Sequence, residues 1–228
     1  MVKTIFFDLD NTLFDFNKAE KTALSKTLQQ MGIDPTPTLL TRFSELNLAQ
    51  WKLLEQGKIS RDQVKIRRYQ LLFEEIGSDC SAREAAKIYE TYLGIGHYYM
   101  DGAEELLQNL SQRYQLYLVT NGTASVQKGR IASASLDNYF QDIFISEIVG
   151  FDKPRLEYFQ HCFAQIPDFD KALSVIVGDS LTSDIQGGKN AGIRTVWFNP
   201  ACVENHSGLL PDYEIHHLRE FQALVETL

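Results

Sequence analysis

Short apolar runs alternate with helical patterns along most of this chain, and that alternation constrains the fold more than any other feature. Apolar runs that end in polar or turn-forming residues lie at 2–7, 116–119, 143–145, 173–177 and 194–198, and a short sixth strand is expected near 213–215. Between them, apolar residues recur at the spacing of one helix face, at 103–113, 156–165, 183–191 and 220–225. Strands that alternate with helices indicate an α/β fold, a doubly wound, Rossmann-like parallel sheet covered on both faces.

One long segment interrupts the alternation. Residues 15–100 contain no convincing strand and show only helical patterns, at 18–32, 38–56, 60–77 and 81–93. A single crossover helix between two parallel strands needs far less chain. We therefore predict two domains: a catalytic core formed by residues 1–14 and 101–228, and an inserted four-helix cap domain formed by residues 15–100.

The composition narrows the classes of partner. A net charge of −8 at pH 7 argues against a nucleic-acid polymer, because proteins that bind one carry a basic face. The run before Asp8 is too short for a signal peptide, and no stretch is long and apolar enough for a membrane span. Three cysteines that lie far apart indicate neither a zinc site nor a disulfide framework. The sequence therefore predicts a cytoplasmic protein without a membrane partner.

Polar side chains gather at or near the ends of the predicted strands. In chain order they are Asp8, Asp10, Thr12, Thr120, Asn121, Lys153, Asp179 and Asp184. Ligands of a doubly wound sheet bind beyond the carboxyl ends of the strands, so we expect these side chains at one edge. Carboxylates in one crevice repel each other unless a cation or a proton lies among them. Oxygen ligands that share a site with phosphate favour Mg²⁺.

Each of these residues has a structural alternative when it is taken alone. Asp8 and the Thr120–Asn121 pair are typical of turns and helix caps, and a lysine before a proline is commonly a solvated loop residue. Asp179 and Asp184 could cap the helix that is predicted from Ser183. Their shared location at one edge of the sheet favours a functional site over separate structural roles.

The same residues resemble the motifs of the haloacid dehalogenase-like hydrolase superfamily, in its phosphatase branch with a helical cap after the first strand. The Asp-x-Asp-x-Thr motif is matched in FFDLDNTL, and the later motifs are matched in VTNG, FDKP and VGDSLTSDIQGGKNAG. The motifs occur in the family's order, and the resemblance covers nearly the whole chain. The dehalogenases of the superfamily lack an acid at the position of Asp10, so its presence favours phosphoryl transfer over carbon–halogen cleavage.

This resemblance implies Mg²⁺-dependent hydrolysis of a small phosphorylated metabolite through an aspartyl phosphate. Asp8 is then the nucleophile, Asp10 exchanges a proton with the leaving oxygen and with water, and Thr12 orients Asp10. Phosphate contacts are implied for Thr120, for the backbone around Asn121 and for Lys153. Metal contacts are implied for the Asp8 side chain, the Asp10 carbonyl group and Asp179, and for Asp184 from outside the direct ligands or through water.

The substrate is indicated only by the inserted segment. Its stretches LAQWKLLEQGKIS and RRYQLLFEEIG resemble the cap of pyrimidine 5'-nucleotidases, which implies a nucleoside 5'-monophosphate. Phe14, Trp51 and Arg68 are candidates for the neighbourhood of the leaving group, although helical spacing favours core packing for Trp51. Arg68 is expected to be a solvated helix residue unless it points into the crevice. The alternatives are a phosphoglycolate or sugar-phosphate phosphatase, a mutase, and a non-catalytic phospho-acceptor domain of the receiver type. The large insertion argues against the last.

Overall fold

The computed structural model describes residues 1–228. Its strands are β1 (Thr4–Phe7), β2 (Gln115–Thr120), β3 (Asp142–Ile145), β4 (Ser174–Gly178), β5 (Arg194–Phe198) and β6 (Tyr213–Ile215). They form one parallel sheet in the order β3-β2-β1-β4-β5-β6. The chain reverses its winding direction between β1 and β4, which is the arrangement of a doubly wound fold. The fold class expected from the sequence is confirmed.

The α-helices are α1 (Phe16–Gln30), α2 (Pro37–Glu55), α3 (Arg61–Glu75), α4 (Ala82–Leu93), α5 (Ala103–Leu110), α6 (Ala124–Ser133), α7 (Ser146–Val149), α8 (Leu156–Ala164), α9 (Gln186–Ala191) and α10 (Leu218–Val225). A π-helical turn, η3 (Leu181–Ile185), leads into α9. Short 3₁₀ segments lie at η1 (Leu136–Tyr139) and η2 (Lys171–Leu173). None of the helices has the length and apolar composition of a membrane span.

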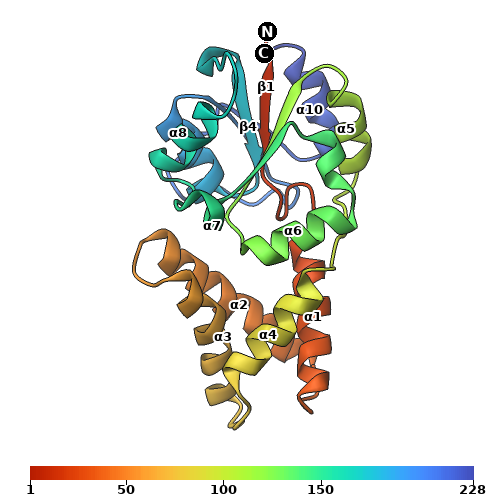
Figure 1. Cartoon of the computed structure of the whole chain (residues 1–228), viewed down its shortest axis with the longest axis vertical. Coiled ribbons are helices and arrows are strands. Elements are labelled where there is room, and N and C mark those ends of the chain that lie inside the picture. The colour runs from red at the N-terminus through yellow and green to blue at the C-terminus, as the bar shows by residue number, and fades with distance from the viewer. The chain divides into compact units, whose positions relative to one another are not determined.

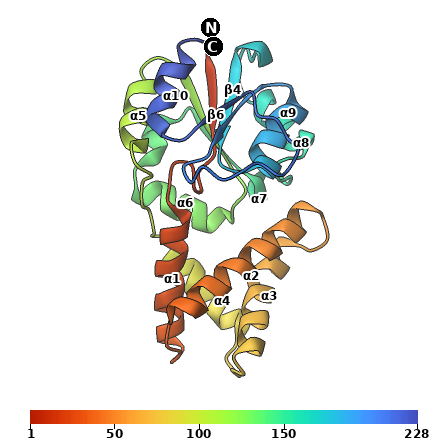
Figure 2. The same ribbon diagram turned by 180° about the vertical axis from the view of Figure 1, so that it is seen from behind.

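The central strands are apolar because both faces of the sheet are covered. Every residue of β1 and β4 is buried. Helices α5 and α10 lie on one face, and α8 and α9 lie on the other (Figures 1 and 2). On the α8 side, Phe6 packs against Tyr117 and Phe163 with ring centroids 5.7 Å apart in both pairs. This packing fixes the strand that leads to the predicted site.

The chain divides into two compact units. The core unit comprises residues 1–16, 97–124 and 134–228, and the helical unit comprises residues 17–96 and 125–133. The sequence did not anticipate α6, most of which belongs to the helical unit. Gly129 of α6 lies so close to Gly94 that a Cβ atom would come within 2.4 Å of the Gly94 carbonyl oxygen. The assignment of 1–14 and 101–228 to a core domain and of 15–100 to a cap domain stays a prediction.

Arg68 differs from expectation. It is buried in the helical unit rather than solvated, and its Nη1 donates to Asn47 Oδ1 at 2.8 Å. Its guanidinium lies 4.6 Å from the centre of the Tyr89 ring, and Asn47 in turn donates to buried Glu20 at 2.6 Å. A polar chain and an aromatic face therefore replace water around the charge.

The other two leaving-group candidates lie in different units. Trp51 is half-buried in the helical unit, with the Arg61 guanidinium 5.6 Å from its ring. Phe14 is fully buried in the core unit, edge-on to Tyr99.

Candidate active site

The turn that follows β1 begins the site. Asp8 N–H donates to Val177 O at 2.9 Å, so the pairing of β1 with β4 extends to this residue. The N–H groups of Leu13 and Phe14 both donate to Leu9 O, which closes a tight turn. Within this turn, Asn11 has a left-handed backbone conformation with φ 57°, which asparagine adopts more readily than most residues. The turn thereby presents Asp8, and it buries Leu9 and Leu13 beneath it.

Lys153 connects this turn to the strands on either side. Its Nζ donates to Asp8 Oδ1 at 2.6 Å, to Asp184 Oδ1 at 2.7 Å and to Val119 O at 2.8 Å, and its side chain is 1% exposed. Burial by itself lowers the pKa of this ammonium group, but Asp184 and Asp8 outweigh it, so the pKa lies above its ordinary value. The group therefore stays charged, and its three protons have three acceptors.

Asn121 holds Lys153 rather than offering its side chain to a ligand. Its Nδ2 donates to Lys153 O at 2.8 Å, and its Oδ1 accepts from Lys153 N–H at 2.8 Å. This reciprocal pair fixes the loop that carries the lysine. Thr120 is the last residue of β2, directly before Asn121, and it is buried. The phosphate contacts predicted for Thr120 and for the backbone around Asn121 stay a prediction.

The loop after β4 brings Asp179 to the same edge. Its N–H donates to Thr12 Oγ1 at 3.0 Å, and Thr12 Oγ1 lies 3.5 Å from Asp8 Oδ2. Thr12 thus contacts two residues of the predicted metal set, Asp8 and Asp179, and its predicted role in orienting Asp10 stays a prediction. Asp10 lies two residues from Asp8 in the same turn and is half-buried.

Asp184 lies in the π-helical turn η3. Ser180 N–H donates to its Oδ2 at 3.0 Å, while its Oδ1 accepts from Lys153. Gly178 makes room for it, since a Cβ atom at that position would come within 2.3 Å of the Asp184 carboxyl carbon. Sequence reasoning found Gly178 and Asp184 but missed Ser180, whose only signal is its place after Asp179.

The carboxylates of Asp8, Asp179 and Asp184 form one group, which we call the three-carboxylate cluster. Each offers an oxygen, and these oxygens lie within 4.8 Å of one another. Burial is the main cause that raises the pKa of Asp8 from 3.8 to about 7; Lys153 opposes this shift, and Asp184 and Asp10 add to it. Burial, followed by Asp8 and Asp184, also raises the pKa of Asp179. One lysine does not balance this many acids, so the cluster suits a further cation.

The raised pKa of Asp8 predicts how stability depends on pH without metal. A carboxyl group whose folded pKa exceeds its unfolded pKa stabilises the fold below the unfolded value, and this stability is lost as pH rises through the folded value. In EDTA, the melting temperature of the wild type should therefore fall further between pH 5 and pH 8 than that of Asp8→Asn, whose amide cannot ionise. We expect the two decreases to differ by several degrees, since about 2–4 °C corresponds to 1 kcal/mol in a chain of this size.

Thermal unfolding at the two pH values measures this difference. Asp34→Asn, at an exposed loop position, serves as the control and should follow the wild type. A larger decrease in Asp8→Asn than in the wild type would show that ionised Asp8 stabilises the fold, and the assigned direction would be wrong.

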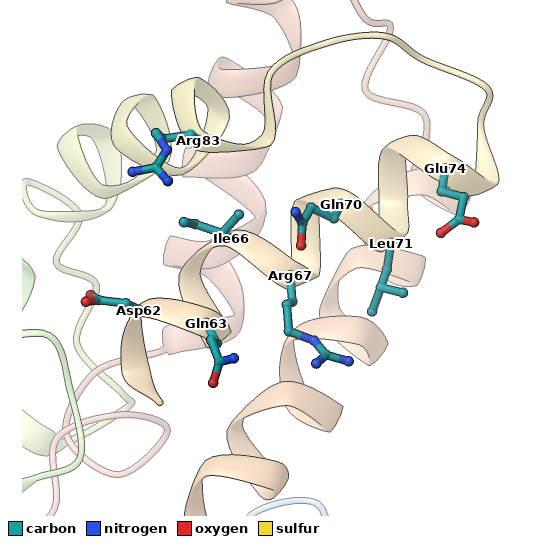
Figure 3. A pocket seen from close by; sticks show the side chains of 8 residues that line it. All are labelled: Asp62, Gln63, Ile66, Arg67, Gln70, Leu71, Glu74 and Arg83. Atoms are coloured by element: carbon teal, nitrogen blue, oxygen red, sulfur yellow. The ribbon is translucent and has the colours of Figure 1, made fainter. Parts of the chain in front are cut away.

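A separate groove lies on the helical unit, along α3 and the start of α4. Its volume is about 660 Å³, and it is lined by Asp62, Gln63, Ile66, Arg67, Gln70, Leu71, Glu74 and Arg83 (Figure 3). The two arginines and the two acids cancel in formal charge. Figure 3 shows that the guanidinium groups of Arg67 and Arg83 point apart. The groove therefore offers no convergent charge for a phosphate, in contrast to the edge that carries Lys153.

Comparison with known proteins bears on this geometry. The profile of a family described as haloacid dehalogenase-like hydrolase matches residues 5–198. YfnB of Bacillus subtilis, described as a HAD hydrolase, is 39% identical over 98% of this chain and 95% of its own length. The pyrimidine 5'-nucleotidase PynA of Streptococcus pneumoniae is 39% identical over 99% of this chain and 94% of its own. A magnesium-bound crystal structure of YfnB superposes with a TM-score of 0.94 at 38% identity, covering 98% of both chains.

Proposed function

This chain belongs to the haloacid dehalogenase-like hydrolase family, and we propose that it is a Mg²⁺-dependent phosphatase that cleaves phosphomonoesters through an aspartyl phosphate on Asp8. One observation carries the proposal: a buried carboxylate at the end of the first strand is paired with a buried lysine and lies within the three-carboxylate cluster. A carboxylate in that setting has a fixed orientation and a cationic partner for the charge that phosphate brings.

The two oxygens of Asp8 have different surroundings, which suggests their roles. Oδ1 accepts from Lys153 Nζ at 2.6 Å, whereas the only contact that we find for Oδ2 is the long one to Thr12. Oδ2 is therefore the oxygen that we assign to attack on phosphorus. A bond forms between Oδ2 and phosphorus while the bond from phosphorus to the ester oxygen breaks, and Asp10 gives the departing oxygen its proton. Water then attacks phosphorus while the bond between phosphorus and Oδ2 breaks, and Asp10 takes a proton from the water, so that inorganic phosphate leaves and the Asp8 carboxylate is restored.

The chemistry of the donor set fits Mg²⁺. Carboxylate oxygens are the hard ligands that this ion prefers, and three of them lie within 4.8 Å of one another. We assign the ion to Asp8 and Asp179, with the Asp10 carbonyl oxygen as a further ligand. Both oxygens of Asp184 already accept hydrogen bonds, from Lys153 and Ser180. We therefore do not assign Asp184 as a direct ligand, and its negative charge acts on the ion from outside the ligand set. When it is bound, the ion supplies positive charge that lets two anions approach each other.

We further propose that the substrate is a nucleoside 5'-monophosphate, with a pyrimidine base. The support is the similarity over nearly the full length of both chains to PynA, together with the two cap stretches of the helical unit that resemble those of pyrimidine 5'-nucleotidases. The residues at the edge of the sheet are assigned contacts to the phosphate group alone, so they do not distinguish one phosphomonoester from another.

A substrate panel tests both levels of the proposal. Phosphate release should be measured with nucleoside 5'-monophosphates, sugar phosphates, phosphoglycolate and p-nitrophenyl phosphate. We expect turnover of p-nitrophenyl phosphate, loss of activity in EDTA, recovery with Mg²⁺, and the highest kcat/KM for pyrimidine nucleotides. A preference for sugar phosphates or phosphoglycolate would overturn the nucleotidase assignment alone. Turnover that survives EDTA, or no turnover of any substrate, would overturn the phosphatase mechanism.

A further inference from the structure

Two side chains hold the backbone of Asp179, and one comes from a strand that contributes nothing else to the proposed chemistry. On one side, Asp179 N–H donates to Thr12 Oγ1 at 3.0 Å. On the other, the indole Nε1–H of Trp197 donates to the Asp179 carbonyl oxygen at 2.8 Å. Both backbone polar groups of the proposed metal ligand therefore have side-chain partners, from β1's turn and from β5.

Trp197 is itself firmly placed. It is 3% exposed, and it pairs with Gly178, the residue before Asp179, in the parallel register of β4 and β5. Strand β5 lies between β4 and β6. Just past Trp197, Asn199 N–H donates to Ile215 O at 2.8 Å, and Asn199 Nδ2 donates to Glu214 Oε1 at 2.7 Å. The indole thus stands on a strand that is fixed along both edges and at its end.

The site needs such a support because its carboxylates repel each other. Asp179 belongs to the three-carboxylate cluster, whose oxygens lie within 4.8 Å of one another, and like charges at that separation repel each other. A flexible backbone would relieve this repulsion by moving Asp179 away. Moving away would leave its carbonyl oxygen without a partner unless water replaces the indole, so the hydrogen bond from Trp197 resists that movement.

We propose that Trp197 is a positioning residue for Asp179, and that its indole N–H preorganises the carboxylate of this residue for a divalent cation. The inference rests on the proposed function, in which Asp179 holds Mg²⁺. It adds a residue to the site that the four sequence motifs do not contain. Groups that orient metal ligands without touching the metal change metal affinity by about 10–100-fold when they are removed.

The test uses Trp197→Phe, which keeps an aromatic ring but removes the N–H donor. Trp51→Phe is the matched control, because the chain has two tryptophans and Trp51 lies in the helical unit. Calorimetric titration with MgCl₂ should show at least a tenfold higher Kd for Trp197→Phe and an unchanged Kd for Trp51→Phe. With p-nitrophenyl phosphate, the Mg²⁺ concentration for half-maximal rate should rise equally, while kcat at saturating Mg²⁺ should recover most of the wild-type value.

A second measurement keeps the inference testable if Trp197→Phe does not fold. In Trp51→Phe, all indole fluorescence comes from Trp197, and it should change on addition of MgCl₂ with the midpoint found by calorimetry. The inference would be overturned if the Kd for Mg²⁺ were unchanged in Trp197→Phe, or if the fluorescence of Trp197 did not change on addition of MgCl₂. Either result would leave the phosphatase proposal intact. A wild-type protein that binds no Mg²⁺ would overturn both.

Discussion

Asp8→Asn is expected to lower kcat by on the order of 10³-fold or more, as happens when a covalent nucleophile is removed. The amide has nearly the same shape as the carboxylate, but it is a poor nucleophile and carries no charge for Lys153 to pair with. The contacts of the Asp8 backbone, including the hydrogen bond to Val177, do not depend on the side chain. Turnover should therefore be lost without a loss of folding.

Steady-state phosphate release from p-nitrophenyl phosphate with Mg²⁺ measures this effect. Mass spectrometry of acid-quenched wild type during turnover should also show a fraction that is heavier by one phosphoryl group, located on the peptide that carries Asp8. Asp34→Asn should retain wild-type turnover. Ordinary activity in Asp8→Asn, or a phosphoryl group found on another residue, would show that Asp8 is not the nucleophile.

Lys153→Met is expected to have the second large effect, and it should reduce both stability and activity. Methionine fills a similar volume but leaves Asp8 and Asp184 buried without the ammonium group that each contacts. Removing one partner of a buried ion pair typically costs about 3–5 kcal/mol. For a chain of this size, this predicts a decrease in melting temperature of roughly 10 °C at pH 8 in EDTA.

Two further observations separate charge loss from packing loss in Lys153→Met. The decrease should shrink at pH 5, where protonation relieves the repulsion between the carboxylates, and it should shrink when Mg²⁺ is added at pH 8. Turnover should fall by about 10²–10³-fold even at saturating Mg²⁺, because the cation beside the phosphate is missing.

Two more variants are needed to interpret the effect of Lys153→Met on stability. Lys58→Met, at an exposed position, is the control and should melt with the wild type. In the double variant Asp8→Asn/Lys153→Met, the loss of stability should be smaller than in Lys153→Met alone, because the neutral amide leaves one buried carboxylate fewer without a counter-charge. A loss as large as that of Lys153→Met alone would show that the charge of Asp8 does not cause the effect.

Much of this architecture follows from local sequence patterns. Strand β5, at 194–198, could be predicted to the residue, because a largely apolar run of that length bounded by turn formers has few other stable arrangements in a sheet covered on both faces. Helix α6 escaped prediction. Its buried residues include Gln127 and Arg130, so its buried face is partly polar and carries a weak periodic signal.

Local sequence patterns were enough to predict the sheet, the helices that follow β1 and the edge at which acids and a lysine collect, because the period of apolar residues and the ends of strands are local properties. The contacts of each polar side chain became known from the three-dimensional arrangement alone. It assigned the Asn121 side chain to the Lys153 backbone, buried Arg68 against Tyr89, and brought the Trp197 indole to the Asp179 carbonyl oxygen. These pairings join residues 18 to 32 positions apart, and their geometry depends on how packed strands and loops align, which no local pattern encodes.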